Sequence, residues 1–133
     1  MKRLLLLITL ILALVAVRPV LAQEDITLRV VTYDSFSISE EVEAQFEEET
    51  GIDLEFILTS DAGAMVNQSI LRRNNPLGDV MYGIDNTFLT RGLENDLFIP
   101  YESPLLDEVS DDFELDAGEF RVTPVTFGDV CLN

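Results

Sequence analysis

The feature that most constrains this chain is an alternation between two hydrophobic periods along residues 26–100. Segments of alternating, β-branched residues are followed by segments whose apolar residues recur every three or four positions, which is the difference between a strand and a helix. The predicted strands are residues 26–33, 53–58 and 79–84, and the predicted helices are residues 37–51, 64–73 and one that begins at Asp85 and Asn86. This β-α-β-α-β-α order predicts an α/β fold, with a mostly parallel open sheet and helices on both faces.

Local signals set the expected boundaries of these elements. Ser37 and Glu40 have the spacing of a capping box, and Gly51 is expected to end the helix that they begin. Residues 60–63 are expected to form a loop. Residues 101–118 predict a long connection or an irregular helix, and residues 121–133 predict one or two further strands.

The N-terminus has the pattern of a secretory signal peptide over residues 1–22. Lys2 and Arg3 precede an apolar run, residues 4–17, that is shorter than the ~18 residues of a bilayer span. Val20 and Ala22 fit the positions before a cleavage site. Because Gln23 follows in place of a lipid-carrying Cys, we expect residues 23–133 to form an exported domain that is not tethered to the membrane.

The net charge argues against nucleic acid as a partner. The whole chain has a formal charge of -17, and removal of the three basic residues in the signal peptide would make it -20. A surface of this kind repels nucleic acid and anionic lipid, and attracts cations weakly. Most of the carboxylates are expected on solvated helix faces and loops.

The supply of catalytic and metal-binding side chains is small. The chain has no His, which excludes a His-based triad and imidazole catalysis within these residues. Its single Cys, Cys131, lies in an apolar run and is expected to be a buried thiol. We therefore predict no catalytic residue, no metal site and no cofactor.

Polar residues cluster where each predicted strand ends. In an open parallel sheet ligands bind outside the carboxyl ends of the strands, so these loops share one edge. The candidate ligand-binding residues there are Tyr33, Asp34, Asp61, Ala62, Gly63, Asp85 and Asn86.

Each candidate has a functional and a structural interpretation. Tyr33 suits stacking on a flat ring, and the start of the helix after Asp61 suits an anion or, through the carboxylate, an amino group. Alternatively, Asp61 and Asp85 are simple helix N-caps and Tyr33 closes the core. The sequence leaves both interpretations open.

These same loops resemble the thiamine-binding proteins of bacterial ABC importers. The strings that carry the resemblance are Val-Thr-Tyr-Asp-Ser-Phe at 31–36, Asp-Ala-Gly-Ala-Met-Val-Asn at 61–67, Gly-Asp-Val-Met-Tyr-Gly-Ile-Asp-Asn-Thr-Phe-Leu at 78–89 and Phe-Gly-Asp-Val-Cys-Leu-Asn at 127–133. The resemblance implies a type II periplasmic binding protein that captures thiamine or its phosphates and delivers it to a membrane permease. Tyr33 would stack on the pyrimidine ring, with Asp61 and Ala62 near the polar or phosphate end. Asp34, Asp85 and Asn86 would order the loops.

The resemblance also implies a second lobe beyond Asn133, so residues 23–133 are expected to be an incomplete N-terminal lobe with negligible thiamine affinity alone. Two alternatives stay open. One is a binding protein for another small ligand, such as a polyamine or iron. The other is a secreted thiaminase-like enzyme, which would need Cys131 as its nucleophile.

Overall fold

The computed structural model describes residues 26–126 except 114 and 117. The predicted signal peptide, residues 1–22, therefore lies outside the described residues. So does Cys131.

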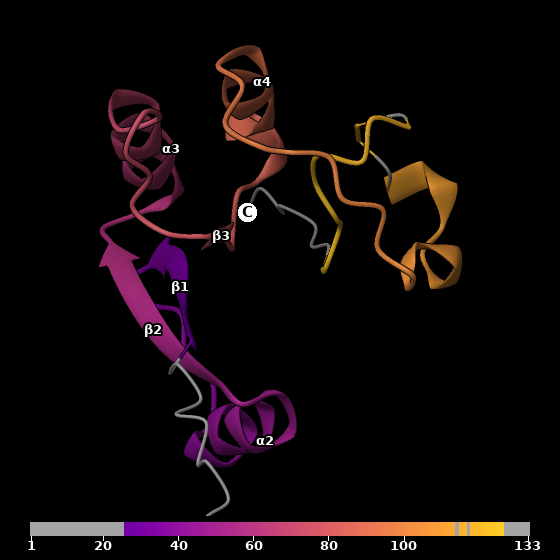
Figure 1. Ribbon diagram of the computed structural model, residues 1–133. Helices are drawn as coiled ribbons and strands as arrows, with labels where there is room; N and C mark the ends of the chain where they lie inside the picture. Colours follow the sequence, from indigo (N-terminus) through magenta and orange to yellow (C-terminus); the bar gives the residue numbers. More distant parts are fainter. Residues whose placement is uncertain (1–25, 114, 117, 127–133) are drawn as a thin grey trace, which may run out of the picture.

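Two long parallel strands and one short strand form the sheet (Figure 1). β1 (Ile26–Tyr33) pairs with β2 (Ile52–Thr59) along its whole length, and β3 (Val80–Met81) pairs with the other side of β1. The order is β2-β1-β3. This open parallel sheet with helices confirms the predicted α/β class, and it is consistent with part of one lobe of a type II periplasmic binding protein.

α2 (Glu40–Thr50) connects β1 to β2 and lies near the amino ends of the strands (Figure 1). The predicted cap was wrong: Ser39, not Ser37, is the N-cap, and its hydroxyl accepts the Val42 N–H. Residues 36–39 are not helical, and Ser39 itself is extended (φ -76°, ψ 149°), so the helix begins only at Glu40. Gly51 ends the helix in the left-handed conformation, as expected.

α3 (Ala62–Leu71) and α4 (Asn86–Glu94) begin at the opposite end of the sheet. Asp61 and Asp85 are their N-caps. α3 begins two residues earlier than predicted, because the Asp61 carboxylate accepts the Ala64 N–H and so starts the helix at once. Ala62 and Gly63 consequently belong to the first turn of a helix and not to a loop.

β3 is much shorter than the predicted strand of residues 79–84. Hydrogen bonds from Asp79 N–H to the Arg29 carbonyl (2.8 Å) and from Tyr82 N–H to the Val31 carbonyl (2.9 Å) extend its attachment to β1. Gly83 then adopts φ +97°, which no strand residue has, and this takes the chain out of the sheet.

The segment after α4 contains two 3₁₀ turns, η1 (Leu106–Glu108) and η2 (Asp111–Phe113). They lie within residues 101–118, which form the predicted long connection in the part that the structure describes. Asp116 and Arg121 fasten this segment through a two-pronged ion pair, with 2.6 Å between Arg121 Nη2 and Asp116 Oδ1.

The prediction of strand from Arg121 onward was wrong for residues 121–126, which form none. The Arg121 backbone N–H donates to the Asp116 carboxylate instead of to a neighbouring strand. The rest of that prediction, residues 127–133, lies outside the described residues.

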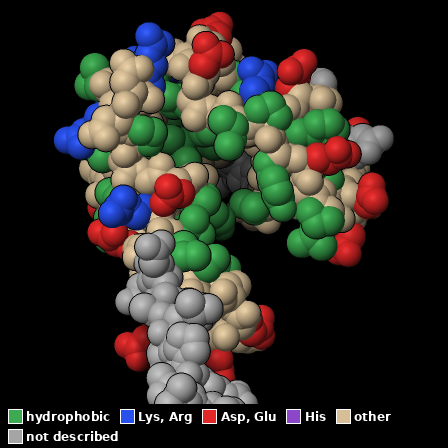
Figure 2. All heavy atoms as spheres, viewed as in Figure 1, with side chains coloured by type: hydrophobic (Ala, Val, Ile, Leu, Met, Phe, Trp, Pro, Cys, Tyr) green, Lys and Arg blue, Asp and Glu red, His purple; other side chains and the backbone are tan. Residues whose placement is uncertain are grey.

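The core is small and lies mainly between the sheet and the two helices at its carboxyl edge. Its buried apolar residues are Val31, Met65, Val66, Leu89 and Leu106. Apolar side chains also gather across the middle of the face in Figure 2, with acidic side chains around it. Within the described part of the chain, no helix is long and apolar enough to cross a membrane.

Candidate functional site

The strand order singles out one position along the carboxyl edge of the sheet. The chain leaves β1 toward β2 on one side, and later returns past β1 to β3 on the other side. Such a reversal is a topological switch point, where the loops after the two adjacent strands separate. The candidate site therefore lies between the ends of β1 and β3, and the start of α3 follows β2 at the same edge (Figure 1).

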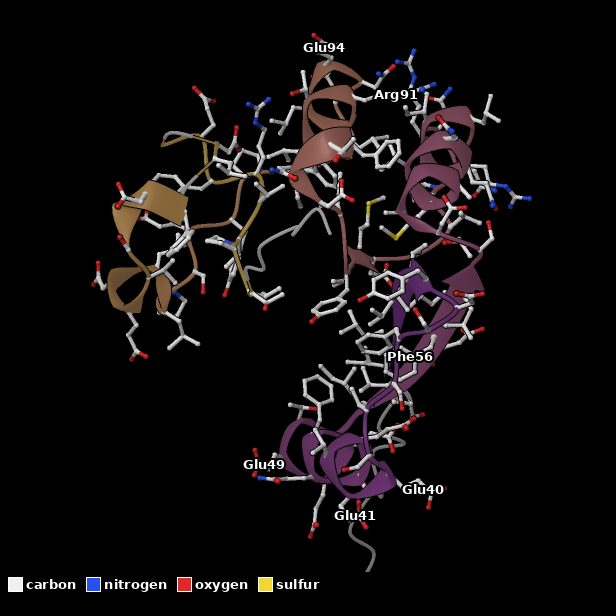
Figure 3. All side chains as sticks on the ribbon, turned by 180° about the vertical axis from the view of Figure 1, so that it is seen from behind. Glu40, Glu41, Glu49, Phe56, Arg91 and Glu94 are labelled. Atoms are coloured by element: carbon white, nitrogen blue, oxygen red, sulfur yellow. The ribbon has the colours of Figure 1, made fainter. Side chains whose placement is uncertain are left out.

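The loop after β1 is a tight turn with a fixed base. The Phe36 N–H donates to the Tyr33 carbonyl across 3.0 Å. The Phe36 ring packs between Phe56 and Tyr82, with ring centroids 5.4 and 5.0 Å away. Figure 3 shows Phe56, a residue of β2, among other side chains of the sheet. The packing of Phe36 thus holds the turn against the sheet, while Asp34 in the turn is exposed.

Tyr33 is half-buried at the end of β1 and lies against Gly83. A Cβ added to Gly83 would overlap the Tyr33 ring, so only a residue without a side chain fits there. Gly83 was not among the predicted site residues. Its place inside the predicted strand of residues 79–84 was the sequence signal that could have indicated it, because an isolated glycine in a strand pattern suggests a close backbone approach.

Asp61 carries the negative charge of the site at the start of α3. Its Oδ1 accepts the Ala64 N–H (2.7 Å) and its Oδ2 accepts the Ser60 hydroxyl (3.1 Å). These hydrogen bonds, the Ala64 one foremost, hold the pKa of Asp61 below its ordinary value of 3.8, so the group is ionised near neutral pH. The exposed carboxylate suits a cation or a hydrogen-bond donor.

Ala62 and Gly63 differ in their accessibility. Ala62 is half-buried in the first turn of α3, whereas Gly63 is buried. A Cβ at Gly63 would come within 2.8 Å of Cζ of Phe88, which belongs to α4. This close contact gives Gly63 a packing role, and its predicted ligand contact stays a prediction.

Asp85 holds the start of α4 in the same way. One carboxylate oxygen accepts the N–H groups of Thr87 (2.9 Å) and Phe88 (3.1 Å). Asn86, the first residue of the helix, is exposed. The geometry thus bears out the N-cap interpretation of Asp85 and leaves both side chains outside the Tyr33–Gly83 contact.

The described side chains at this edge are suited to recognising a ligand. No group of three His, Cys, Asp or Glu side chains among them could hold a metal ion. A small hollow after α4, lined in part by Leu106 and Phe120, contains Asp116 already paired with Arg121. An exposed carboxylate, an accessible tyrosine and two helix starts are suited to recognising a small polar ring.

A comparison with curated proteins gives one family-level indication. In an alignment of 84 positions that covers 59% of this chain, the sequence is 32% identical to the thiamine-binding periplasmic protein of Brucella suis biovar 1 (strain 1330). The match covers 25% of that protein, so the chain spans about a quarter of its relative's length. This similarity supports a solute-binding role.

Two further comparisons add nothing to this indication. No protein-family model matches the chain. No solved structure matches it.

Proposed function

We propose that this chain is the first lobe of a solute-binding protein that captures thiamine or a thiamine phosphate for an ABC importer. The observation that carries the proposal is the placement of Tyr33, half-buried against Gly83 at the switch point between β1 and β3. The similarity to a thiamine-binding periplasmic protein supports the same class of ligand. No catalytic step is proposed.

The chemistry of thiamine suits the groups at this edge. Its aminopyrimidine is a flat ring that stacks on a phenol, and its thiazolium carries a positive charge that acidic surroundings attract. Asp61 is ionised and exposed, so it suits an amino or hydroxyl group of the ligand. The same carboxylate would repel a phosphate at the start of α3, which favours the unphosphorylated vitamin.

The remaining parts of the proposal concern the whole protein. Residues 1–22 would direct export and be removed, leaving residues 23–133 as the first lobe in the periplasm. A membrane permease would receive the ligand. The exported protein should therefore begin at Gln23, which an intact-mass measurement checks.

A ligand screen on the full-length protein tests the proposal. Thiamine should raise the unfolding temperature, because a ligand that binds only the folded state stabilises it. Tyr33→Phe should keep the shift, since the ring face is unchanged, and Tyr33→Leu should lose most of it. An unchanged shift in Tyr33→Leu would contradict the role of the ring.

A polyamine is the second candidate ligand. The three carboxylates that follow the strands, Asp34, Asp61 and Asp85, are all exposed, and a polycation would pair with them. Spermidine is therefore included beside thiamine and its mono- and diphosphate. A shift with spermidine and none with the thiamine compounds would replace thiamine by a polyamine in the proposal.

A further inference from the structure

We propose that Gly83 is a positioning residue that sets the Tyr33 ring edge-on at the site, so that a ring face stays free for the ligand. The inference rests on the proposed function for the identity of the ligand. The placement of the ring itself rests on the geometry alone.

The register of the sheet brings the two residues together. Val31 pairs with Met81, and the Tyr82 N–H bonds the Val31 carbonyl. Two residues further along each segment, Tyr33 lies opposite Gly83. The ring therefore meets the backbone at the point where β3 leaves the sheet.

The contact involves the edge of the ring. An ideal Cβ on Gly83 would lie nearest Cε1 of Tyr33, 2.7 Å from Cδ1 and 3.5 Å from Cζ. These distances place the added Cβ close to the plane of the Tyr33 ring, outside the edge formed by Cδ1 and Cε1. Gly83 therefore supports the edge and covers neither face.

Tyr33 is half-buried, so part of its side chain is open to solvent. The described aromatic contacts join Phe36 to Phe56 and Tyr82, and none of them includes Tyr33. Any larger residue at position 83 would push the ring from its place. The backbone there has φ +97°, which also disfavours a side chain.

Gly118 provides a matched control for that backbone effect. It also has a positive φ, +79°, but a Cβ added there would meet nothing within 4 Å. Gly83→Ala and Gly118→Ala therefore share the backbone cost, and only the first displaces a ring.

The experiment compares these two variants in the protein as its gene encodes it, in two measurements. The first uses NMR without ligand: the cross-peaks between the Tyr33 ring and Gly83 Hα identify the contact in the wild type. The Tyr33 ring shifts should change in Gly83→Ala and stay unchanged in Gly118→Ala. Absent cross-peaks, or unchanged ring shifts in Gly83→Ala, would overturn the inference whatever the ligand is.

The second measurement titrates thiamine by isothermal titration calorimetry. Gly83→Ala should bind roughly tenfold more weakly, the upper range for losing one aromatic stacking contact. Gly118→Ala should bind as the wild type does. In a Tyr33→Leu background, Gly83→Ala should cause no further loss of affinity.

Equal affinities of the two glycine variants would overturn the inference. If the wild type binds no thiamine while the ring still moves in Gly83→Ala, the proposed function fails and the positioning of Tyr33 by Gly83 stands.

Discussion

Two buried threonines near the ends of β1 and β2 have opposite hydrogen-bond situations. The Thr59 hydroxyl donates to the Thr32 carbonyl across 2.9 Å. The Thr32 hydroxyl is fully buried and has no hydrogen-bond partner in the described part of the chain. A buried polar group without a partner costs free energy, whereas a satisfied one contributes.

Replacing each threonine with valine should therefore change stability in opposite directions. Thr32→Val should raise the free energy of unfolding by about 1 kcal/mol, and Thr59→Val should lower it by about the same amount. Urea denaturation measures both, and each variant is the control for the loss of a hydroxyl at the other site. A loss of stability in Thr32→Val would mean that its hydroxyl has a partner.

Asp116 is the carboxylate whose titration should be visible in the stability of the protein. Hydrogen bonds from the Arg121 guanidinium, together with its charge, hold the pKa of Asp116 below the ordinary 3.8. Since the folded state binds the proton less tightly than the unfolded state, the pair stabilises the fold fully above that ordinary value. Its contribution is lost as the pH falls through the lower, folded-state pKa.

Asp116→Asn should accordingly cost about 2 kcal/mol near neutral pH, because it weakens charged hydrogen bonds with little exposure to water. The difference between wild type and variant should shrink as the pH drops below 3.8. Urea denaturation at a series of pH values measures this. A difference that stays constant over the acid range would exclude Asp116 as the titrating group.

At the scale of elements, α2 has its charges poorly matched to one end. Six of its eleven residues are Glu, with Glu40 and Glu41 in the first turn and Glu49 near the end. Figure 3 shows these three side chains directed away from the sheet. Acidic groups stabilise the start of a helix and destabilise its end.

A pair of charge reversals separates this effect from the change in net charge. Glu48→Lys, near the helix end, should raise stability by a few tenths of a kcal/mol at low salt. Glu41→Lys changes the net charge equally but should lower stability. Glu41 lies in the first turn of the helix, where its own backbone N–H, and next the Ser39 hydroxyl, hold its pKa below the ordinary value. Thermal unfolding at low ionic strength compares the two. Equal shifts would point to net charge alone.

The elements also mark what the sequence pattern can predict. β1 was predicted with the bounds that it has, because alternating β-branched residues are unambiguous over eight positions. Asp85 was predicted as a helix N-cap because a short acidic residue directly before a helical pattern is also a local signal. The strand predicted over residues 79–84 was too long. The chain turns away at Gly83, where it lies against the Tyr33 ring, and local periodicity cannot show a contact between residues fifty positions apart. The Tyr33–Gly83 contact of the candidate site was missed for that reason, while its position at the carboxyl edge followed from the order of strands and helices.

At the scale of the whole molecule, the net charge lowers the stability of the fold, and the small core raises it only modestly. The chain has a formal charge of -17 and an isoelectric point of about 4.1. Few apolar side chains are fully buried among the residues that the structure describes. Repulsion among the carboxylates therefore opposes a modest hydrophobic gain.

Sodium chloride should consequently raise the unfolding temperature at neutral pH between about 0.02 and 0.3 M, because screening shortens the range of the repulsion. The same increase of salt should have little effect near the isoelectric point, where the net charge vanishes. Differential scanning calorimetry at both pH values tests this. A salt effect of equal size at both would indicate ion-specific exclusion from the surface in place of charge screening.

The contact between Gly63 and Phe88 has a consequence for redesigning the ligand preference of this edge. Because the Phe88 ring of α4 lies against the backbone of Gly63 in α3, a side chain added at residue 63 would have to displace that ring or the start of α3. Variants of the Asp61 loop and of the Asp85 loop are therefore not independent, and an engineered specificity would have to be selected from combinations of the two.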